Sequence, residues 1–141
     1  MAYFSQPITV TAATTLSRKP HAGNVVVLDS STGRIITLPA SVGNGDVYTV
    51  QIKTTVSSGN HVVQVANSTD VMQGSVGLVV GVAGTIGLTA STSDTITMNG
   101  STTGGIFGSW MRFTDVVAGF WMVEGNLNGS GTMTTPFSAA V

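Results

Sequence analysis

Residues 96–105 read ITMNGSTTGG, a glycine-rich loop after a strand-like run, and loops of this kind can cradle a phosphate. A phosphate-binding loop of the G-x-x-x-x-G-K-[ST] type also needs a lysine and a helix whose N-terminus faces the anion. Here no lysine follows, and the next segment is aromatic and strand-like. The Asn99–Gly100 pair favours the positive φ angles of a tight turn. We therefore interpret the loop as a connection between two strands.

The acidic residues would support acid–base catalysis only if two of them faced each other across a cleft, as in a glycosidase. Their spacing pairs none of them. Four of them flank predicted turns, where a short carboxylate caps backbone N–H groups, and we predict structural roles for these four. The acidic residues are Asp29, Asp46, Asp70 and Asp94, which flank the turns, together with Asp115 and Glu124.

The other residue types that carry chemistry are sparse. His21 and His61 are the only histidines, and neither has a second ligand at a metal spacing such as H-x-x-x-H. Cysteine is absent, which excludes disulfides and thiol nucleophiles. No G-x-S-x-G pattern marks a nucleophilic serine. We therefore expect no catalytic residue, no metal and no cofactor, and we predict that the protein is not an enzyme.

Five aromatic residues lie in strand-like segments, and two interpretations stay open for the tryptophans and their neighbours. On alternating strands such side chains usually lie in the core, because each buries a large area. The alternative is a platform on which sugar rings stack, for which Trp110 and Trp121 are the best candidates. We predict core positions for the set as a whole: Tyr48, Trp110, Phe113, Phe120 and Trp121.

The elements that must position these residues are strands. The chain holds 20 valines and 21 threonines, which favour strands, but a single glutamate and two lysines. Short alternating or apolar runs are separated by glycine- and serine-rich turns, which predicts a single-domain β-sandwich or jelly roll of about 8–10 short antiparallel strands. Residues 24–39 and 47–66 each have the pattern of a hairpin.

Both ends of the chain are apolar and nearly free of charge. We predict an N-terminal arm over residues 1–20, a sandwich domain over 21–130 and an extended tail over 131–141. Short apolar ends have little reason to remain in water, so we expect them to dock on a neighbouring subunit, for example by adding a strand to an open sheet edge. The candidate interface residues are Tyr3, Phe4, Pro7, Ile8, Val10, Pro136 and Phe137.

The small number of charged residues limits the classes of partner that the chain can bind. Only 8% of the 141 residues are charged, and the formal net charge is −1. Five scattered basic residues cannot follow a phosphate backbone, and no apolar run approaches the roughly 18 residues that span a bilayer. We therefore expect neither nucleic-acid nor membrane binding. Ordinary domains carry about a quarter charged residues, so the low charge predicts that other chains cover much of this surface.

Two long stretches carry a resemblance to a known class. RIITLPASVGNGDVYTVQIKTTVSSGNHVVQVANSTDVMQG has a strand ending in T-L-P, a glycine loop, an alternating strand, a polar turn, a valine strand and a D-x-x-x-G turn. SDTITMNGSTTGGIFGSWMRFTDVVAGFWMVEGNL has D-T-I-x-x-N-G and then a tryptophan strand closing on W-x-V-x-G. Together they resemble small virion proteins of tailed bacteriophages, most closely capsid decoration, or cement, proteins.

This resemblance implies a structural protein of the virion, made in the host cytoplasm and placed on the capsid exterior. Such β-sandwich or jelly-roll subunits dock as homodimers or homotrimers on an icosahedral shell. There they bridge major capsid subunits and stabilise the expanded shell. No catalytic residues come with the resemblance. A tail-fibre or receptor-binding module that holds carbohydrate has similar turn and strand patterns, and it remains the alternative.

Overall fold

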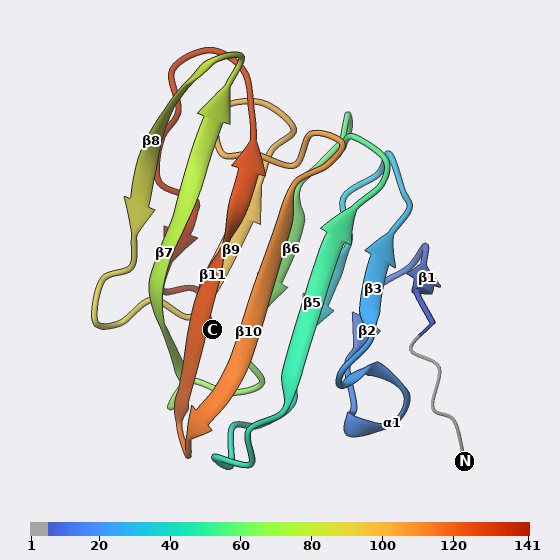
Figure 1. Ribbon diagram of the computed structural model, residues 1–141, viewed down its shortest axis with the longest axis vertical. Coiled ribbons are helices and arrows are strands. Elements are labelled where there is room, and N and C mark those ends of the chain that lie inside the picture. Colours follow the sequence, from blue (N-terminus) through green and yellow to red (C-terminus); the bar gives the residue numbers. More distant parts are fainter. Residues whose placement is uncertain (1–5) are drawn as a thin grey trace.

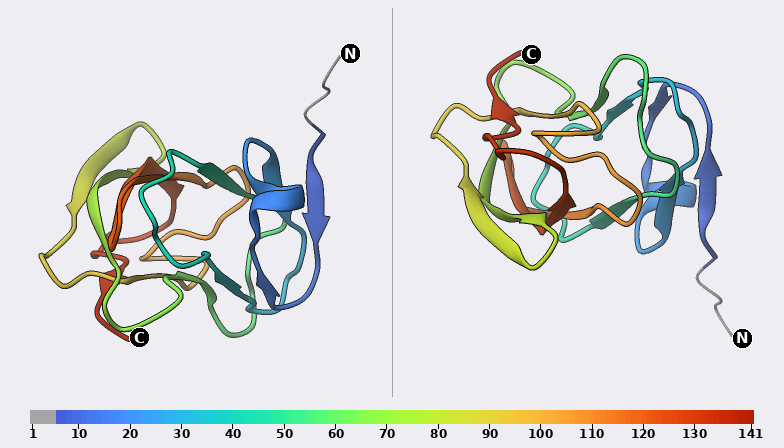
Figure 2. Two further views of the ribbon diagram at one scale, coloured as in Figure 1. Left: turned by 90° about the horizontal axis from the view of Figure 1, so that it is seen from below. Right: turned by 90° about the horizontal axis from the view of Figure 1, so that it is seen from above.

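The structure is a computed structural model that describes residues 6–141, and these residues form two facing β-sheets (Figures 1 and 2). The larger sheet contains, in spatial order, β1 (Ile8–Val10), β3 (Val25–Leu28), β5 (Val47–Ile52), β10 (Trp110–Val117), β11 (Phe120–Asn128), β7 (Val71–Val80) and β8 (Ala83–Leu88). The smaller sheet contains β12 (Phe137–Ser138), β9 (Thr95–Met98), β6 (His61–Gln64), β4 (Ile35–Thr37) and β2 (Thr14–Thr15). A single helical turn, α1 (Arg18–His21), connects β2 to β3. The predicted all-β sandwich is confirmed.

The first six strands wind alternately between the two sheets. In the larger sheet β1, β3 and β5 run parallel to one another, and in the smaller sheet β2, β4 and β6 do the same. The chain therefore makes three coils, each of which gives one strand to each layer. The expected hairpins at residues 24–39 and 47–66 are wrong, because β3 and β4, like β5 and β6, lie in opposite sheets. Each pair is joined by an arch across the core.

The second half of the chain follows antiparallel pairing more closely. β7 and β8 form one hairpin, and β10 and β11 form the other. β9 returns to the smaller sheet and lies between β6 and β12. One further parallel pair joins β11 to β7. Both sheets are therefore mixed, and the expectation of a wholly antiparallel fold is wrong.

Apolar side chains from both sheets fill the space between the layers. Of the five aromatic residues expected there, Tyr48, Phe113 and Trp121 are buried, and the rings of Tyr48 and Trp121 meet edge to face with centroids 5.7 Å apart. Burying a side chain such as that of Phe113 stabilises the fold by about 1.5–3 kcal/mol. Trp110 and Phe120 are only half-buried. Because Met111 and Phe113 face the core, the two-residue period of β10 turns Trp110 outward.

The N-terminal segment is not a separate arm within the described residues. Ile8 and Val10 belong to β1 and pair with β3, and Val10 and Leu16 are part of the chain's own core. Pro7 is exposed and Ile8 is half-buried. Tyr3 and Phe4 lie outside the described residues.

The tail over 131–141 also packs on its own domain. Pro136 and Phe137 are buried, and Phe137 pairs with Ile96 of β9. The Asp94 carboxylate accepts the N–H of Ala140 at 2.8 Å, which fixes the last residues. The apolar character that predicted docking on a neighbour is explained at these positions by the core of the same chain.

Candidate functional site

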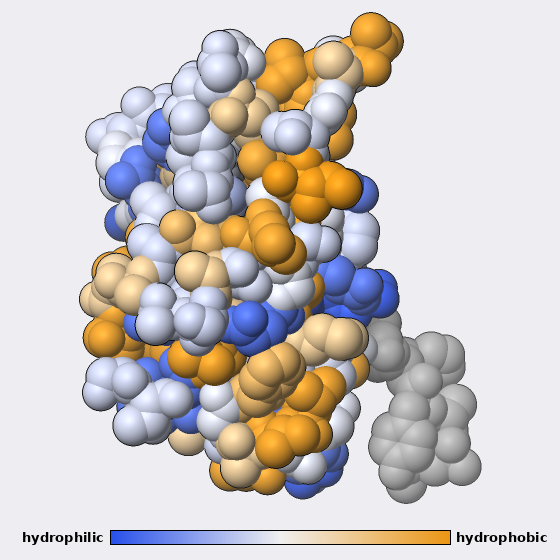
Figure 3. All heavy atoms as spheres, turned by 90° about the vertical axis from the view of Figure 1, so that its left-hand side faces the viewer, coloured by the Kyte–Doolittle hydropathy of each residue, from blue (hydrophilic) through white to orange (hydrophobic). Residues whose placement is uncertain are grey.

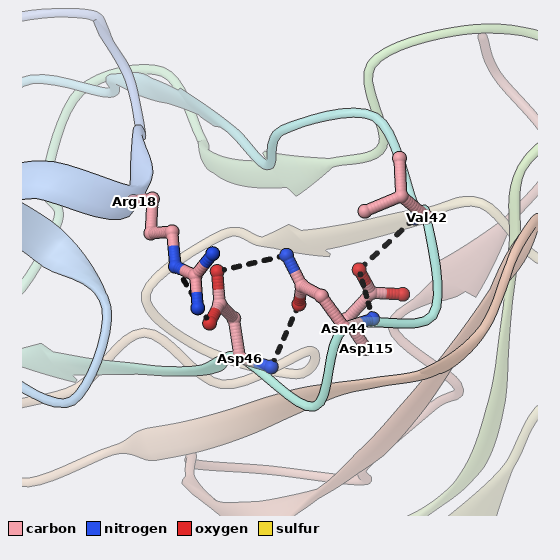
Figure 4. Close-up of polar contacts among 5 residues, drawn as sticks. All are labelled: Arg18, Val42, Asn44, Asp46 and Asp115. Carbon is pink, nitrogen blue, oxygen red and sulfur yellow. Dashed lines mark hydrogen bonds and ion pairs between the residues drawn. The ribbon is translucent and has the colours of Figure 1, made fainter.

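Asp115 is the most highly connected carboxylate of the described structure, and it fixes the loop over residues 41–46. It lies near the end of β10 and is 2% exposed. Its carboxylate accepts the Ser41 hydroxyl at 2.7 Å and the N–H of Gly43 at 2.9 Å. It also accepts the N–H of Val42 at 3.0 Å (Figure 4). Burial opposes ionisation, but the hydrogen bonds from Ser41, Val42, Gly43 and Asn44 outweigh it and hold the pKa of Asp115 below its ordinary 3.8.

A second set of polar contacts ties the same loop to α1. Asn44 donates its side-chain amide to the Asp46 carboxylate at 3.1 Å and accepts the Asp46 N–H at 2.8 Å. Arg18 completes the set with an ion pair to Asp46 at 3.3 Å (Figure 4). Arg18 is exposed, so this pair adds less than about 1 kcal/mol. Its effect is to hold the loop in one conformation.

The loop and the turn of the β10–β11 hairpin together present an exposed apolar surface, which we call the apolar tip: Val42, Val116 and Val117. Val42 and Val117 are each 62% exposed. Val42 forms an isolated bridge with Ala118, so the two segments lie side by side. A side chain at Gly43 would press on the backbone of Ala118, so the backbones of the loop and the hairpin approach each other closely here. Asp115, which is buried beneath the loop, therefore fixes the Val42 side of the apolar tip.

A second apolar surface lies along β8, the last strand of the larger sheet, and we call it the β8 edge: Val82, Ile86 and Leu88. Ile86 and Leu88 are each 72% exposed, and Val82 at the end of the hairpin is fully exposed. Figure 3 faces this edge and shows apolar surface gathered on it. No charged residue occurs between positions 71 and 93.

The outer face of the larger sheet carries the one tryptophan that solvent can reach. Trp110 is half-buried, and the Arg112 guanidinium lies 5.7 Å from the centroid of its ring. Arg112 also pairs with Glu124 at 3.0 Å. In the sheet register Trp110 lies between Gln51 and Asn126, and both of these residues are exposed. Trp121, the other candidate for stacking on sugars, is buried in the core.

The glycine-rich loop over 96–105 is a turn whose donors the chain itself uses. The Asn99 side chain accepts the N–H groups of Ser101 and Thr103 at 2.9 and 3.1 Å. Gly100 has φ +78°, and a side chain there would collide with the Val56 carbonyl. Glycine is needed at this position for a close approach between two backbones, and the loop offers no cradle for a phosphate.

The turn-flanking carboxylates connect segments that are distant in sequence. Asp70 accepts the N–H of Ser41 at 2.8 Å, and Asp94 fixes the C-terminal tail. Asp29 accepts Lys53 Nζ at 2.7 Å and the Thr54 hydroxyl at 2.6 Å. Each of these three carboxylates therefore has donors of the chain itself as its partners.

Both histidines make structural contacts. His61 is fully buried, its Nδ1 accepts the N–H of Arg34 at 3.1 Å, and its Nε2–H donates to the Ser30 carbonyl at 3.0 Å. Desolvation lowers the pKa of His61 below 6.5, although the bond to Ser30 opposes the shift. Neutral His61 therefore links β6 to the turn that precedes β4. His21 Nδ1 accepts the N–H of Ser17 at 3.0 Å.

The role of Asp115 was not predicted from the sequence, although the strand pattern contains a signal for it. In the run MRFTDV the inward positions are Met111, Phe113 and Asp115, so the alternation places an acid among core residues. A buried carboxylate needs several donors. The donors come from a loop about 70 residues earlier, and nothing in the strand pattern identifies that loop.

Within residues 6–141, no three histidine, aspartate or glutamate side chains come close enough together to hold a metal ion. None of the described helices has the length and apolar character needed to cross a bilayer. No family model matches the chain, and searches of curated proteins and of solved structures returned no match.

Proposed function

We propose that the protein decorates and cements the outer surface of an icosahedral phage capsid, bridging major capsid subunits and stabilising the expanded shell. The observation that carries the proposal is the apolar tip. A molecule with so little charge holds three exposed valines close together: Val42 lies on a loop that hydrogen bonds to Asp115 fix in place, and Val116 and Val117 lie at the end of β10. Together with the resemblance of the strand and turn patterns to capsid decoration proteins, this favours adhesion over catalysis.

A fixed apolar surface is well suited to adhesion. Binding costs free energy when loops and side chains must become ordered, and valine has few rotamers to lose. The loop at the apolar tip is already ordered by Asp115 and Asp46, so little of that cost remains. Many copies on one shell then convert a modest affinity per subunit into stable attachment.

A charge placed at the apolar tip tests the proposal. Val42→Asp and Val117→Asp each introduce a carboxylate on an exposed side chain. We expect each to weaken co-sedimentation with undecorated expanded shells at least tenfold, because an unpaired charge is costly to bury. Asn60→Asp adds the same charge in an exposed loop at the opposite end of the molecule and serves as the control. Unchanged attachment of both valine variants, with unchanged melting temperatures, would refute docking through the apolar tip.

We also propose that the first five residues contact the shell. Tyr3 and Phe4 remain candidate contacts with the shell, whereas Val10, Pro136 and Phe137 are accounted for by the chain's own core. Removal of residues 1–5 should weaken co-sedimentation and leave the melting temperature unchanged. Full attachment of the shortened chain would remove these residues from the interface.

A carbohydrate-binding module of a phage tail is the second candidate, and the arrangement around Trp110 favours it. An aromatic ring flanked by the amides of Gln51 and Asn126 offers both stacking and hydrogen bonds to a sugar. Trp110→Ala should then abolish binding on a glycan array, while Phe107→Ala, which removes another exposed aromatic ring, should not. Absence of any glycan binding by the intact protein would leave capsid decoration as the better proposal.

A further inference from the structure

The β8 edge differs from the other sheet edges of the described chain in length and in composition. β8 has six residues, whereas β1 has three and β2 and β12 have two each. Exposed edges are normally protected by lysine, proline, bulges or shortness, because unpaired N–H and C=O groups recruit other strands. β8 has none of these protections, and its exposed side chains are apolar.

The backbone groups that β8 leaves unpaired follow from its register with β7. The Thr89 N–H donates to the Gly74 carbonyl at 3.1 Å, so Thr89 belongs to the set of residues whose backbone groups face β7. In an antiparallel ladder this set alternates with residues whose N–H and C=O point away. The outward set in β8 is therefore Gly84, Ile86 and Leu88. The side chains of Ile86 and Leu88 also lie on the outer face of the sheet.

We propose that two copies of this chain associate through β8, antiparallel across a two-fold axis that passes at Ile86. In this register Ile86 lies opposite Ile86 of the second copy, and Gly84 lies opposite Leu88 of the second copy. No other antiparallel two-fold register pairs all three outward residues with outward residues of the same strand. We infer that a second copy of the chain covers this edge, because the edge is complementary to itself. Its outward N–H and C=O groups pair with each other, it carries no charge, and its side chains fit together.

The shape argument rests on the order of side-chain sizes along the outer face. Glycine, isoleucine and leucine follow one another at every second position. The two-fold axis places each leucine over a glycine and the two isoleucines against each other, so the large side chains do not compete for one space. The two larger sheets then join into one continuous sheet through the dimer.

This association is independent of what the protein attaches to, and it predicts two subunits rather than three. A three-fold assembly would need β8 to meet a different surface, because two-fold contacts use the same patch on both copies. A six-residue edge buries less than the roughly 800 Å² per partner of a standard interface. The dimer should therefore dissociate on dilution.

Single cysteines test the register directly, because the chain has no cysteine of its own. Directly opposite residues of a hydrogen-bonded pair have Cα atoms about 5.5 Å apart, within the range of a disulfide. Ile86→Cys should therefore form a disulfide-linked dimer under mild oxidation. Leu88→Cys is the matched control, since it is equally exposed but its two copies would lie about 14 Å apart along the strand.

The oligomeric state supplies the second measurement. Light scattering of the unmodified protein should give a dimer at high concentration, and Ile86→Lys should give a monomer with an unchanged melting temperature. The proposal is overturned if the unmodified protein stays monomeric at about 1 mM, far above the micromolar dissociation constants of weak interfaces. It is also overturned if Ile86→Lys remains dimeric, if Leu88→Cys crosslinks as readily as Ile86→Cys, or if removal of residues 1–5 abolishes the dimer.

Discussion

At the scale of single residues, the buried polar groups determine how the loops are held. Asp115 replaces a core side chain at an inward position of β10 and collects donors from the loop over 41–46. A buried network of this kind stabilises only when it is complete, because each group left without a partner costs about 1–3 kcal/mol.

Asp115→Ala should lower the free energy of unfolding by about 3 kcal/mol, since it leaves the N–H groups of Val42 and Gly43 without an acceptor and removes the hydrogen bond from the Ser41 hydroxyl. Asp115→Asn keeps one acceptor oxygen and should cost less. Urea denaturation measures both. Glu124→Ala removes an exposed carboxylate and should change the free energy by less than about 1 kcal/mol. An Asp115→Ala variant as stable as the unmodified protein would contradict the role given to this network.

His61 gives the fold a defined dependence on pH. The pKa of His61 in the folded chain lies below its ordinary 6.5, so the unfolded chain takes up the proton first as the pH falls. The contribution of neutral His61 is complete above pH 6.5 and is lost as the pH decreases through 6.5 toward the folded pKa. His61→Asn should remove this part of the pH dependence, measured by thermal unfolding between pH 8 and pH 5. An identical pH profile in the variant would show that other groups cause it.

At the scale of elements, strands were predictable and their partners were not. The alternation in VYTVQIK and the valines of HVVQVA place β5 and β6 correctly, because each strand must turn one face to the core. The same alternation fits a hairpin and an arch equally well. The polar residues between the strands do not reveal whether the chain turns back in the same sheet or crosses to the other, so the sequence alone could not predict the three coils.

For the terminal strands too, burial could be predicted from the sequence but the partner strand could not. Val10 and Phe137 were recognisable as residues that must be buried. Their short segments have no strand partner nearby in sequence, since β1 pairs with β3 and β12 pairs with β9. The sequence therefore indicated that Val10 and Phe137 must be buried, but not whether the residues that bury them belong to the same chain or to another. The alternation of β10 places Asp115 among core residues, but nothing in that pattern identifies the distant loop that supplies its donors.

The integration of β1 into the larger sheet can be tested by truncation. Removal of residues 1–10 deletes Ile8 and Val10 and exposes the edge of β3, so we expect a loss of at least about 2 kcal/mol of stability. Removal of residues 1–5 retains β1 and serves as the control. Chemical denaturation of the two shortened chains gives the comparison. Equal stability of the two would mean that β1 contributes nothing to the sandwich.

At the scale of the whole molecule, the small number of charges determines how the surface interacts. The described residues contain three ion pairs, each with an exposed basic side chain: Arg18–Asp46, Lys53–Asp29 and Arg112–Glu124. Neither the apolar tip nor the β8 edge includes a charged residue. Contacts made by these surfaces should depend on excluded water rather than on counterions.

Attachment to expanded shells should therefore be unchanged or stronger when the salt concentration rises from about 0.1 to 1 M, a range over which the Debye length shrinks from about 10 to 3 Å. Co-sedimentation at a series of salt concentrations measures this. A protein that attaches through lysine and arginine contacts would lose affinity steeply over the same range. A tenfold loss of attachment at high salt would contradict docking through uncharged surfaces.

The position of β10 has a consequence for synthesis on the ribosome. β10 connects the coiled first half of the larger sheet to its second half, because it pairs with β5 on one side and β11 on the other. Translation must proceed through residue 117 before β5 gains this neighbour. Until then the nascent polypeptide presents β5 as an open strand, able to pair with another unfinished copy on the same polysome. Such mispairing would remove chains before the sandwich is complete, so translation through residue 117 should be the stage at which losses occur.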